Sequence, residues 1–288
     1  MNTMKLLDAF EDLCLARDLS KGTRENYRRA IRYLNDYVGK DLDCKELNHR
    51  LVNGWLARCE DQYDPQYVRS LRRDLLVVWN HAADLEACEY PKNRLIRLSA
   101  LPEKTPEAWP LEWMNQLLEG CRKLRGKVRG SNIERRYYAE AYFRVQFELL
   151  CRPTDMRHLL WCQLEGETIE FVQNKTRRKF RGALSDDARF SLSLIRGLHD
   201  QVIFPLRKTA TELMIRRVFE LSGIEKPKGQ SLGHVRHTGG SVIAKQCGND
   251  KARASLGHTP NSTVFEKHYL DPRFTERDTA KANLWWAG

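Results

Sequence analysis

Apolar residues recur every three or four positions through the first hundred residues, which is the spacing of one buried helix face. They are Tyr27, Ala30, Ile31, Leu34 and Val38 in one stretch, and Val68, Leu71, Leu75, Val78, Ala82 and Leu85 in another. Shorter runs at Leu6, Phe10 and Leu13 and at Leu47, Leu51 and Trp55 predict two more helices. Thr23 is placed to cap the first long helix. Four helices with short connections predict a small bundle over residues 1–98.

The pattern stops at SALPEKTPEAWP, residues 99–110, which holds three prolines and no apolar repeat. Such a stretch is typical of a linker. Residues 111–288 are therefore predicted to form a second domain.

The second domain begins with a predicted helix, LEWMNQLLEGC, followed by a basic loop with seven Lys and Arg among residues 121–136. YYAEAYFRVQFELL is apolar enough for a buried helix. In residues 166–184, β-branched and aromatic residues flank the polar segment NKTRR, which predicts a β-hairpin with that segment at its tip. Helical patterns resume from Ser185. The expected fold class is mainly α with a small antiparallel β-sheet (α+β).

The charge of the chain is unevenly distributed. Residues 1–105 hold 18 Lys and Arg against 17 Asp and Glu, whereas residues 106–288 hold 31 against 21, so +10 of the net charge of +11 lies in the second part. This excess favours a nucleic acid partner, although a merely soluble basic protein remains an alternative. Arginines also flank both long apolar stripes of the bundle. They are either solvated or face DNA.

Several classes are disfavoured. No run of 18 apolar residues predicts a membrane span, and the acidic residues of the N-terminal stretch argue against a secretory signal. None of the eight cysteines forms a C-x-x-C pair, so a zinc ribbon or finger is not expected. Scattered single cysteines fit a reducing cytoplasm.

Five segments carry candidate chemistry. In CRPTDMRHLLW, Pro153 suits a first helical position and places Arg152 at a helix entry. Lys175 lies in the predicted hairpin tip, and Arg236 lies in GHVRHTGG, where two glycines permit close backbone approach. His258 follows Gly257, and Tyr269 is the only tyrosine after Tyr142. Taken singly, each residue has an ordinary structural interpretation, such as a capping arginine or a solvated lysine.

The order Arg, Lys, Arg-His-Thr, Leu-Gly-His, Tyr over residues 152–269 resembles the tyrosine recombinase, or phage integrase, family. The resemblance covers the second domain and extends in a general way to the first, as a core-binding domain. It implies that Tyr269 is the nucleophile, that Arg152 and Arg236 bind the scissile phosphate, that Lys175 protonates the leaving 5′ oxygen and that His258 donates to the phosphate. It implies neither a metal nor another cofactor.

Two positions depart from the family pattern. Gly233 stands where the family usually has histidine. His234, one residue later, is a candidate to replace that histidine; if it does not, no residue takes the histidine's catalytic role. The span from His258 to Tyr269 is also slightly longer than usual.

The implied function is site-specific DNA recombination or integration, in which DNA is cut and rejoined through a 3′-phosphotyrosyl intermediate. The alternatives are a type IB topoisomerase-like enzyme and a recombinase-like DNA-binding protein that has lost catalysis. The expected partners are double-stranded DNA sites, inverted repeats in the simplest case, and three further copies in a homotetramer on DNA. We expect a cytoplasmic, DNA-associated protein of a bacterium, phage or mobile element. Trp285 and Trp286 are predicted to fill a pocket on their own domain or on the next subunit.

Overall fold

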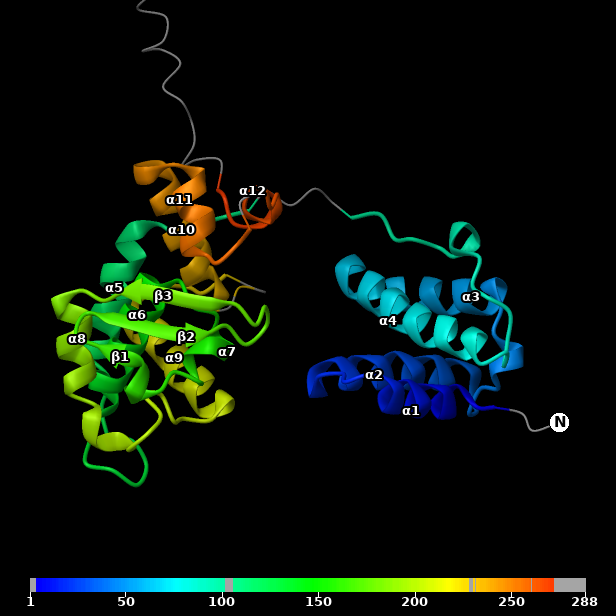
Figure 1. Cartoon of the computed structure of the whole chain (residues 1–288), viewed down its shortest axis with the longest axis horizontal. Helices are drawn as coiled ribbons and strands as arrows, with labels where there is room; N and C mark the ends of the chain where they lie inside the picture. Colours follow the sequence, from blue (N-terminus) through cyan, green and yellow to red (C-terminus); the bar gives the residue numbers. More distant parts are fainter. Residues whose placement is uncertain (1–3, 102–105, 228–229, 231, 260, 272–288) are drawn as a thin grey trace, which may run out of the picture. The chain divides into compact units, whose positions relative to one another are not determined.

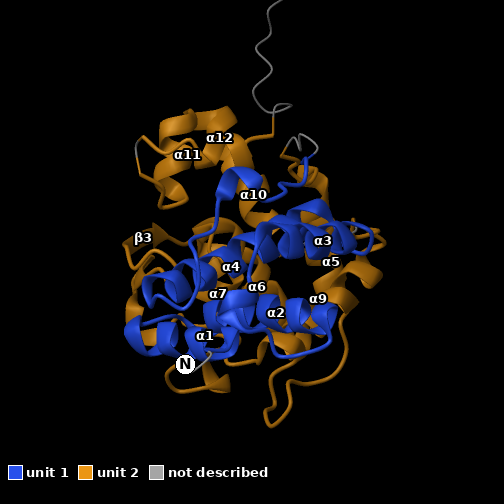
Figure 2. Cartoon of the chain, turned by 90° about the vertical axis from the view of Figure 1, so that its right-hand side faces the viewer, with its two compact units in different colours: residues 1–103 blue, residues 104–288 orange. Residues whose placement is uncertain are grey.

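The chain forms two compact units, residues 1–103 and 104–288 (Figure 2). The computed structural model describes residues 4–101, 106–227, 230, 232–259 and 261–271. Trp285 and Trp286 lie outside these residues. The boundary between the units falls inside the predicted linker segment, in which Ala108 and Trp109 are buried in the second unit.

The first unit is a helical bundle, as the apolar spacing predicted. Its helices are α1 (Leu6–Ala16), α2 (Lys21–Val38), α3 (His49–Glu60) and α4 (Pro65–Asp84), with short 3₁₀ turns at Cys44–Glu46 and Asn93–Leu95. Helix α4 contacts each of the other three. The predicted stripe residues Phe10, Leu34, Trp55 and Leu75 are all buried. The bundle is therefore held by one apolar core, built mainly around α4.

The start of α2 differs from the prediction. The helix begins at Lys21, and the cap is Ser20, whose side chain accepts a hydrogen bond from the Thr23 backbone at 3.2 Å. Thr23 is inside the first turn, and its hydroxyl lies 2.9 Å from that of Ser20. Both residues are good helix caps. Because the first turn of the helix is polar, the apolar pattern does not show at which of the two the helix begins.

The arginines that flank the stripes divide into two groups. Those of α2 at positions 24, 28 and 32 are exposed. On α4, Arg69 donates to the Ser99 carbonyl at 2.6 Å and Arg72 to the Asn93 carbonyl at 3.3 Å. Arg69 and Arg72 thus fasten the chain segment that leaves the bundle, whereas Arg73 is exposed and pairs with Asp74 at 2.9 Å. The exposed arginines of α2 remain a candidate DNA-facing surface.

The second unit surrounds one buried helix. Helix α6 (Arg135–Leu149) contacts α5 (Leu111–Arg122), α7 (Pro153–Met156), α8 (Asp186–Ser193), α9 (Lys208–Ser222), α10 (Gly233–Cys247) and strand β3 (Lys179–Ala183). The short helices are α7, α11 (Asn249–Ser255) and α12 (Val264–His268). Figure 1 shows α10, α11 and α12 gathered at one end of this unit. No helix among the described residues is long and apolar enough to cross a membrane.

The sheet contains the predicted hairpin. Strands β2 (Thr168–Val172) and β3 (Lys179–Ala183) pair antiparallel, with Phe171 opposite Phe180, and β1 (Leu164–Glu165) adds a short third strand beside β2. The connection between β2 and β3 contains the NKTRR segment and points toward α7 in Figure 1. The mainly helical fold with a small antiparallel sheet is thus confirmed.

Candidate active site

Arg152 occupies the entry of α7, where Pro153 is the first helical residue, as predicted. Leu150, the residue that follows α6, has a φ of 47°, a left-handed conformation that turns the chain sharply between the two helices. The Arg152 side chain is half-buried. Its Nη1 lies 3.5 Å from Oε1 of Gln173 and 3.8 Å from Oδ2 of Asp155. The strained turn and these two contacts fix where the guanidinium lies.

Arg236 lies in the first turns of α10 and is only 2% exposed. Its Nη atoms donate to the carbonyls of Leu150 and Leu256. Its central carbon is 5.5 Å from the centroid of the Tyr269 ring. Burial lowers the pKa of Arg236, but an arginine keeps its charge even so. Arg236 therefore joins the ends of α6 and α11 and still presents positive charge to Tyr269.

Glycines allow α10 to approach its neighbours this closely. A Cβ on Gly239 would lie 2.2 Å from Cδ2 of Leu150, and one on Gly240 would lie 3.1 Å from Cδ1 of Leu256. The close approach expected of this pair is therefore real, and it brings Arg236 within reach of both carbonyls.

His258 follows a turn that requires glycine. Gly257 has a φ of 66°, and a Cβ there would lie 2.6 Å from Nε2 of Gln173, a buried side chain. The turn places the His258 ring 5.2 Å from that of Tyr269, edge to face. Burial, followed by the charges of Arg236 and Arg152, lowers the pKa of His258 to about 4. His258 is therefore neutral at pH 7.

Tyr269 ends α12 and is half-buried among these groups. Its backbone carbonyl accepts a hydrogen bond from the Ser241 hydroxyl at 2.9 Å, which ties it to α10. The structure thus brings together four of the predicted residues: Arg152, Arg236, His258 and Tyr269. They come from four separate helix ends or turns of the second unit.

Two buried nitrogen atoms around Tyr269 have no hydrogen-bond partner among the described residues. They are Nε of Arg236 and Nδ1 of His258. Buried polar atoms are almost always paired in folded proteins, so such exceptions often mark places where a ligand binds. Both nitrogens can donate a hydrogen bond, and the site also holds the charged guanidiniums of Arg236 and Arg152. The arrangement therefore suits an anion with several oxygens.

Lys175 lies in the exposed turn between β2 and β3. The turn itself is tethered to the site: the Asn174 backbone donates to Asp155 at 2.8 Å and the Thr176 hydroxyl to Gln173 at 2.7 Å. No contact found among the described residues joins the Lys175 side chain to the other four.

A second histidine that contacts Tyr269, besides His258, is His237, which was not selected from the sequence. Its ring centroid is 4.4 Å from that of Tyr269, whereas the His234 ring stacks on the His237 ring at 4.9 Å. Trp109 lies beyond His234 at 5.9 Å. Burial, followed by the neighbouring charges, lowers the pKa of His237 to about 4. His237 directly follows Arg236 in the sequence, and this position was the available signal. It is overlooked when only a substitute for the histidine missing at Gly233 is sought.

The segment before α5 is also part of the site. The Ala108 backbone donates to Asp271 at 2.7 Å, and the Trp109 backbone donates to the Thr238 hydroxyl at 2.9 Å. Asp271 is 1% exposed and lies two residues after Tyr269. The chain thus holds the Tyr269 segment from both α10 and the segment that leads into α5.

Comparisons with known proteins agree with this architecture. Residues 7–80 match the family model for the phage integrase N-terminal SAM-like domain. Residues 75–356 of lambda integrase, solved as a dimer bound to a COC′ core site, superpose with a TM-score of 0.77 at 15% identity, covering 95% of this chain and 96% of that one. The chain has the tyrosine recombinase fold.

Two further solved structures, of an integrase and of a site-specific recombinase, resemble the chain over nearly its full length. The Tn1549 transposon integrase, in complex with circular intermediate DNA, has a TM-score of 0.68 at 11% identity, covering 98% of this chain and 99% of that one. XerH site-specific recombinase, bound to palindromic difH substrate, has a TM-score of 0.68 at 16% identity, covering 96% and 84%. No curated protein sequence matches the chain.

Proposed function

We propose that the chain is a site-specific DNA recombinase that cuts and rejoins DNA through a 3′-phosphotyrosyl intermediate. The observation that supports this most is the packing of Tyr269 against Arg236 and His258, each with a buried nitrogen for which the described part of the chain supplies no hydrogen-bond partner. A phosphodiester presents the oxygens that these nitrogens and Arg152 can bind.

The proposed reaction begins with attack of the Tyr269 phenol oxygen on the scissile phosphorus. The new bond is the 3′-phosphotyrosyl ester, the bond that breaks is the one to the 5′ oxygen, and the phenol proton passes to solvent water. Lys175 supplies a proton to the leaving 5′ oxygen, since its tethered turn lies next to the elements that hold Arg152. Attack by a 5′ hydroxyl reverses these changes and reseals the strand.

Arg236 and Arg152 stabilise the negative charge that develops on the phosphate. Arg236 has five N–H donors and uses Nη donors on two carbonyls, so its remaining donors can reach the phosphate or Tyr269. Both guanidiniums are held before substrate binds, so little reorganisation accompanies the reaction. Neutral His258 donates one hydrogen bond to a phosphate oxygen.

Recombination exchanges strands between two duplexes, so one tyrosine is needed at each of four half-sites and we propose a homotetramer on DNA. Related structures support this form: lambda integrase has been solved as a tetramer bound to a Holliday junction. XerH was bound to a palindromic substrate, which fits inverted repeats for this chain too.

The test is covalent capture of a nicked suicide duplex that carries the bound site, selected first from random DNA. The wild-type chain should form an adduct that survives denaturing electrophoresis. Tyr269→Phe should form none while binding the same duplex within about threefold, because one hydroxyl contributes little to a charge-driven interface.

An adduct formed by Tyr269→Phe would show that another residue is the nucleophile. A wild-type chain that binds but never forms an adduct would favour a DNA-binding protein without catalysis. Relaxation of one supercoiled duplex with no strand exchange between two would favour a topoisomerase.

A further inference from the structure

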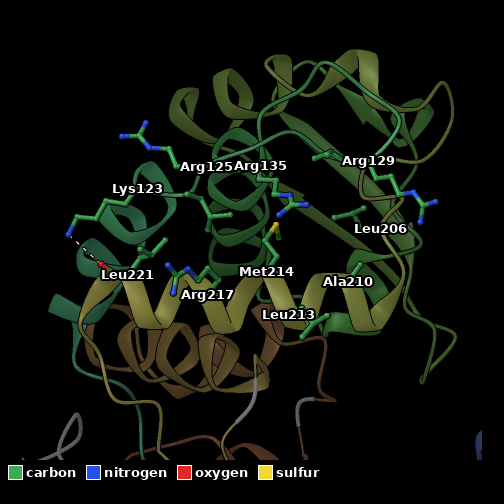
Figure 3. A pocket seen from close by; sticks show the side chains of 12 residues that line it. Lys123, Arg125, Arg129, Arg135, Leu206, Ala210, Leu213, Met214, Arg217 and Leu221 are labelled. Atoms are coloured by element: carbon green, nitrogen blue, oxygen red, sulfur yellow. Dashed lines mark hydrogen bonds between the residues drawn. The ribbon is translucent and has the colours of Figure 1, made fainter.

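The second unit carries a pocket that the proposed reaction does not use. It encloses about 510 Å³ between the basic connection of α5 to α6 and one side of α9 (Figure 3). A volume of this order accommodates several side chains of a ligand or peptide.

The charged residues that line this pocket are all positive. Its lining holds five cations and neither Asp nor Glu, the cations being Lys123, Arg125, Arg129, Arg135 and Arg217. Arg217 pairs with Glu220 just outside the lining at 2.7 Å, and Lys123 donates to the Leu221 carbonyl. No ion pair is found for Arg125 or Arg129 in the described part of the chain, and both are exposed, pointing outward at the rim in Figure 3. The rim therefore attracts an anionic partner.

The floor of the pocket is apolar and runs along α9. Ala210, Leu213, Met214 and Leu221 recur at helical intervals over about 16 Å, or three turns. Leu213 is 57% exposed, which is unusual for a leucine beside a buried core. Buried Leu124 and Val128 close the opposite wall. The groove thus offers an apolar stripe with cations along its edges.

We propose that this groove binds an acidic amphipathic helix of a partner protein. A helix laid along α9 would set apolar side chains at i, i+3, i+4 and i+7 against the stripe, with Asp and Glu at its flanks reaching Arg125, Arg129 and Arg135. A DNA backbone offers phosphates to the rim but no side chain for Leu213 and Met214. The C-terminal segment 272–288 of this chain has three Lys and Arg against two Asp and Glu, so it lacks the required acidity.

The groove and the Tyr269 site lie at opposite ends of α6. Arg135 at the groove is the first residue of that helix, and Leu150 next to its last residue accepts a hydrogen bond from Arg236. A helix of 15 residues spans about 22 Å. Substitutions at the groove should therefore spare DNA cleavage.

The test measures binding of a fluorescein-labelled peptide of about 18 residues, with Leu at i, i+3, i+4 and i+7 and Glu on both flanks, to the full chain. Two variants change the groove: Leu213→Asp, and Arg125→Glu together with Arg129→Glu. Two matched controls lie outside it: Phe190→Asp, which changes an exposed apolar residue of α8, and Arg216→Glu, next to Arg217 on another side of α9.

We expect saturable binding that weakens at least about tenfold in both groove variants and is unchanged in both controls. A peptide with Lys in place of Glu should not bind. Adduct formation on the suicide duplex by Leu213→Asp should match that of the wild type.

Three outcomes would overturn the proposal. One is the absence of saturable binding of the acidic peptide to the wild-type chain. Another is displacement of the peptide by duplex DNA combined with an equal loss of DNA affinity in Leu213→Asp, which would make the groove a DNA-binding surface. The third is self-association that Leu213→Asp abolishes, seen by sedimentation without peptide binding, which would assign the groove to a second copy of this chain.

Discussion

At the scale of single residues, the two arginines of the site differ in how much they stabilise the folded chain. Arg236 is buried and donates to two carbonyls that belong to α6 and to the end of α11, whereas Arg152 is half-buried and contacts only side chains. Removing Arg236 leaves buried carbonyls without their donor, which carries a stability cost in addition to any loss of catalysis.

We therefore predict that Arg152→Ala and Arg236→Ala each slow single-turnover cleavage by about 10² or more. Only Arg236→Ala should also lower the free energy of unfolding, measured by urea denaturation, by about 1–3 kcal/mol. Lysine should rescue either variant poorly, because it lacks the planar fork. Cleavage within threefold of wild type in Arg152→Ala would contradict the phosphate clamp.

The two histidines of α10 also differ, since His237 contacts Tyr269 and His234 contacts His237 and Trp109. We predict that His237→Ala slows adduct formation about tenfold or more, because the tyrosine ring loses the surface it packs against. His234→Ala should have the smaller effect. His237→Phe separates two roles: rescue would assign His237 to ring packing, and failure would assign it to a function of the ring nitrogens. A larger defect in His234→Ala than in His237→Ala would contradict this order.

At the scale of elements, the segment that carries Tyr269 is held to α10 through one serine. The Ser241 hydroxyl donates to the Tyr269 carbonyl and accepts from the Asp271 backbone at 3.1 Å, and Ser241 is fully buried. Asp271 in turn accepts from Ala108, 163 positions away in the sequence. Helix α12 has only five residues, so these bonds rather than the helix itself must fix the nucleophile.

We predict that Ser241→Ala slows adduct formation by about 10- to 100-fold while leaving duplex affinity unchanged, because small displacements of a reacting group are costly. Ser191→Ala is the matched control, since Ser191 is also a buried helical serine of the second unit and bonds the Asp187 carbonyl. The two variants should lose similar stability, but only Ser241→Ala should lose rate. Equal rates in both would show that the serine acts on stability alone.

At the scale of the whole molecule, we predict that two half-buried histidines make stability depend on pH. The pKa of His237 and that of His258 are each lowered from 6.5 to about 4 in the folded chain. Between pH 6.5 and 4 the unfolded chain binds protons that the folded chain does not. The contribution of these two histidines to the free energy of unfolding should therefore be complete above about pH 6.5. It should be lost as the pH falls toward 4.

Urea unfolding at pH 7.5 and pH 5 measures this dependence. The double variant His237→Gln with His258→Gln should show a smaller difference between the two pH values than the wild type. His158→Gln, at an exposed histidine, should keep the wild-type difference. A double variant with an unchanged pH dependence would show that these two histidines are not its source.

The sequence by itself determined most of the fold. Apolar spacing placed the four helices of the first unit, α5, α6 and the β2–β3 hairpin, because each needs only a periodic buried face that local order reveals. The order of the motifs also selected Arg152, Arg236, His258 and Tyr269, which the structure brings together. The cap of α2 was misplaced by three residues, because Ser20 and Thr23 are chemically equivalent there.

Only the tertiary structure decided how Tyr269 is held. Ser241 and Asp271 carry no local signal, and His237 is marked in the sequence only by its position next to Arg236. The roles of all three depend on contacts between α10, α12 and the segment before α5. The same holds for Gly257, whose missing side chain makes room for Gln173. Such contacts join residues that are far apart in the chain, so they exist only after the helices have packed, and no periodicity of the sequence encodes them.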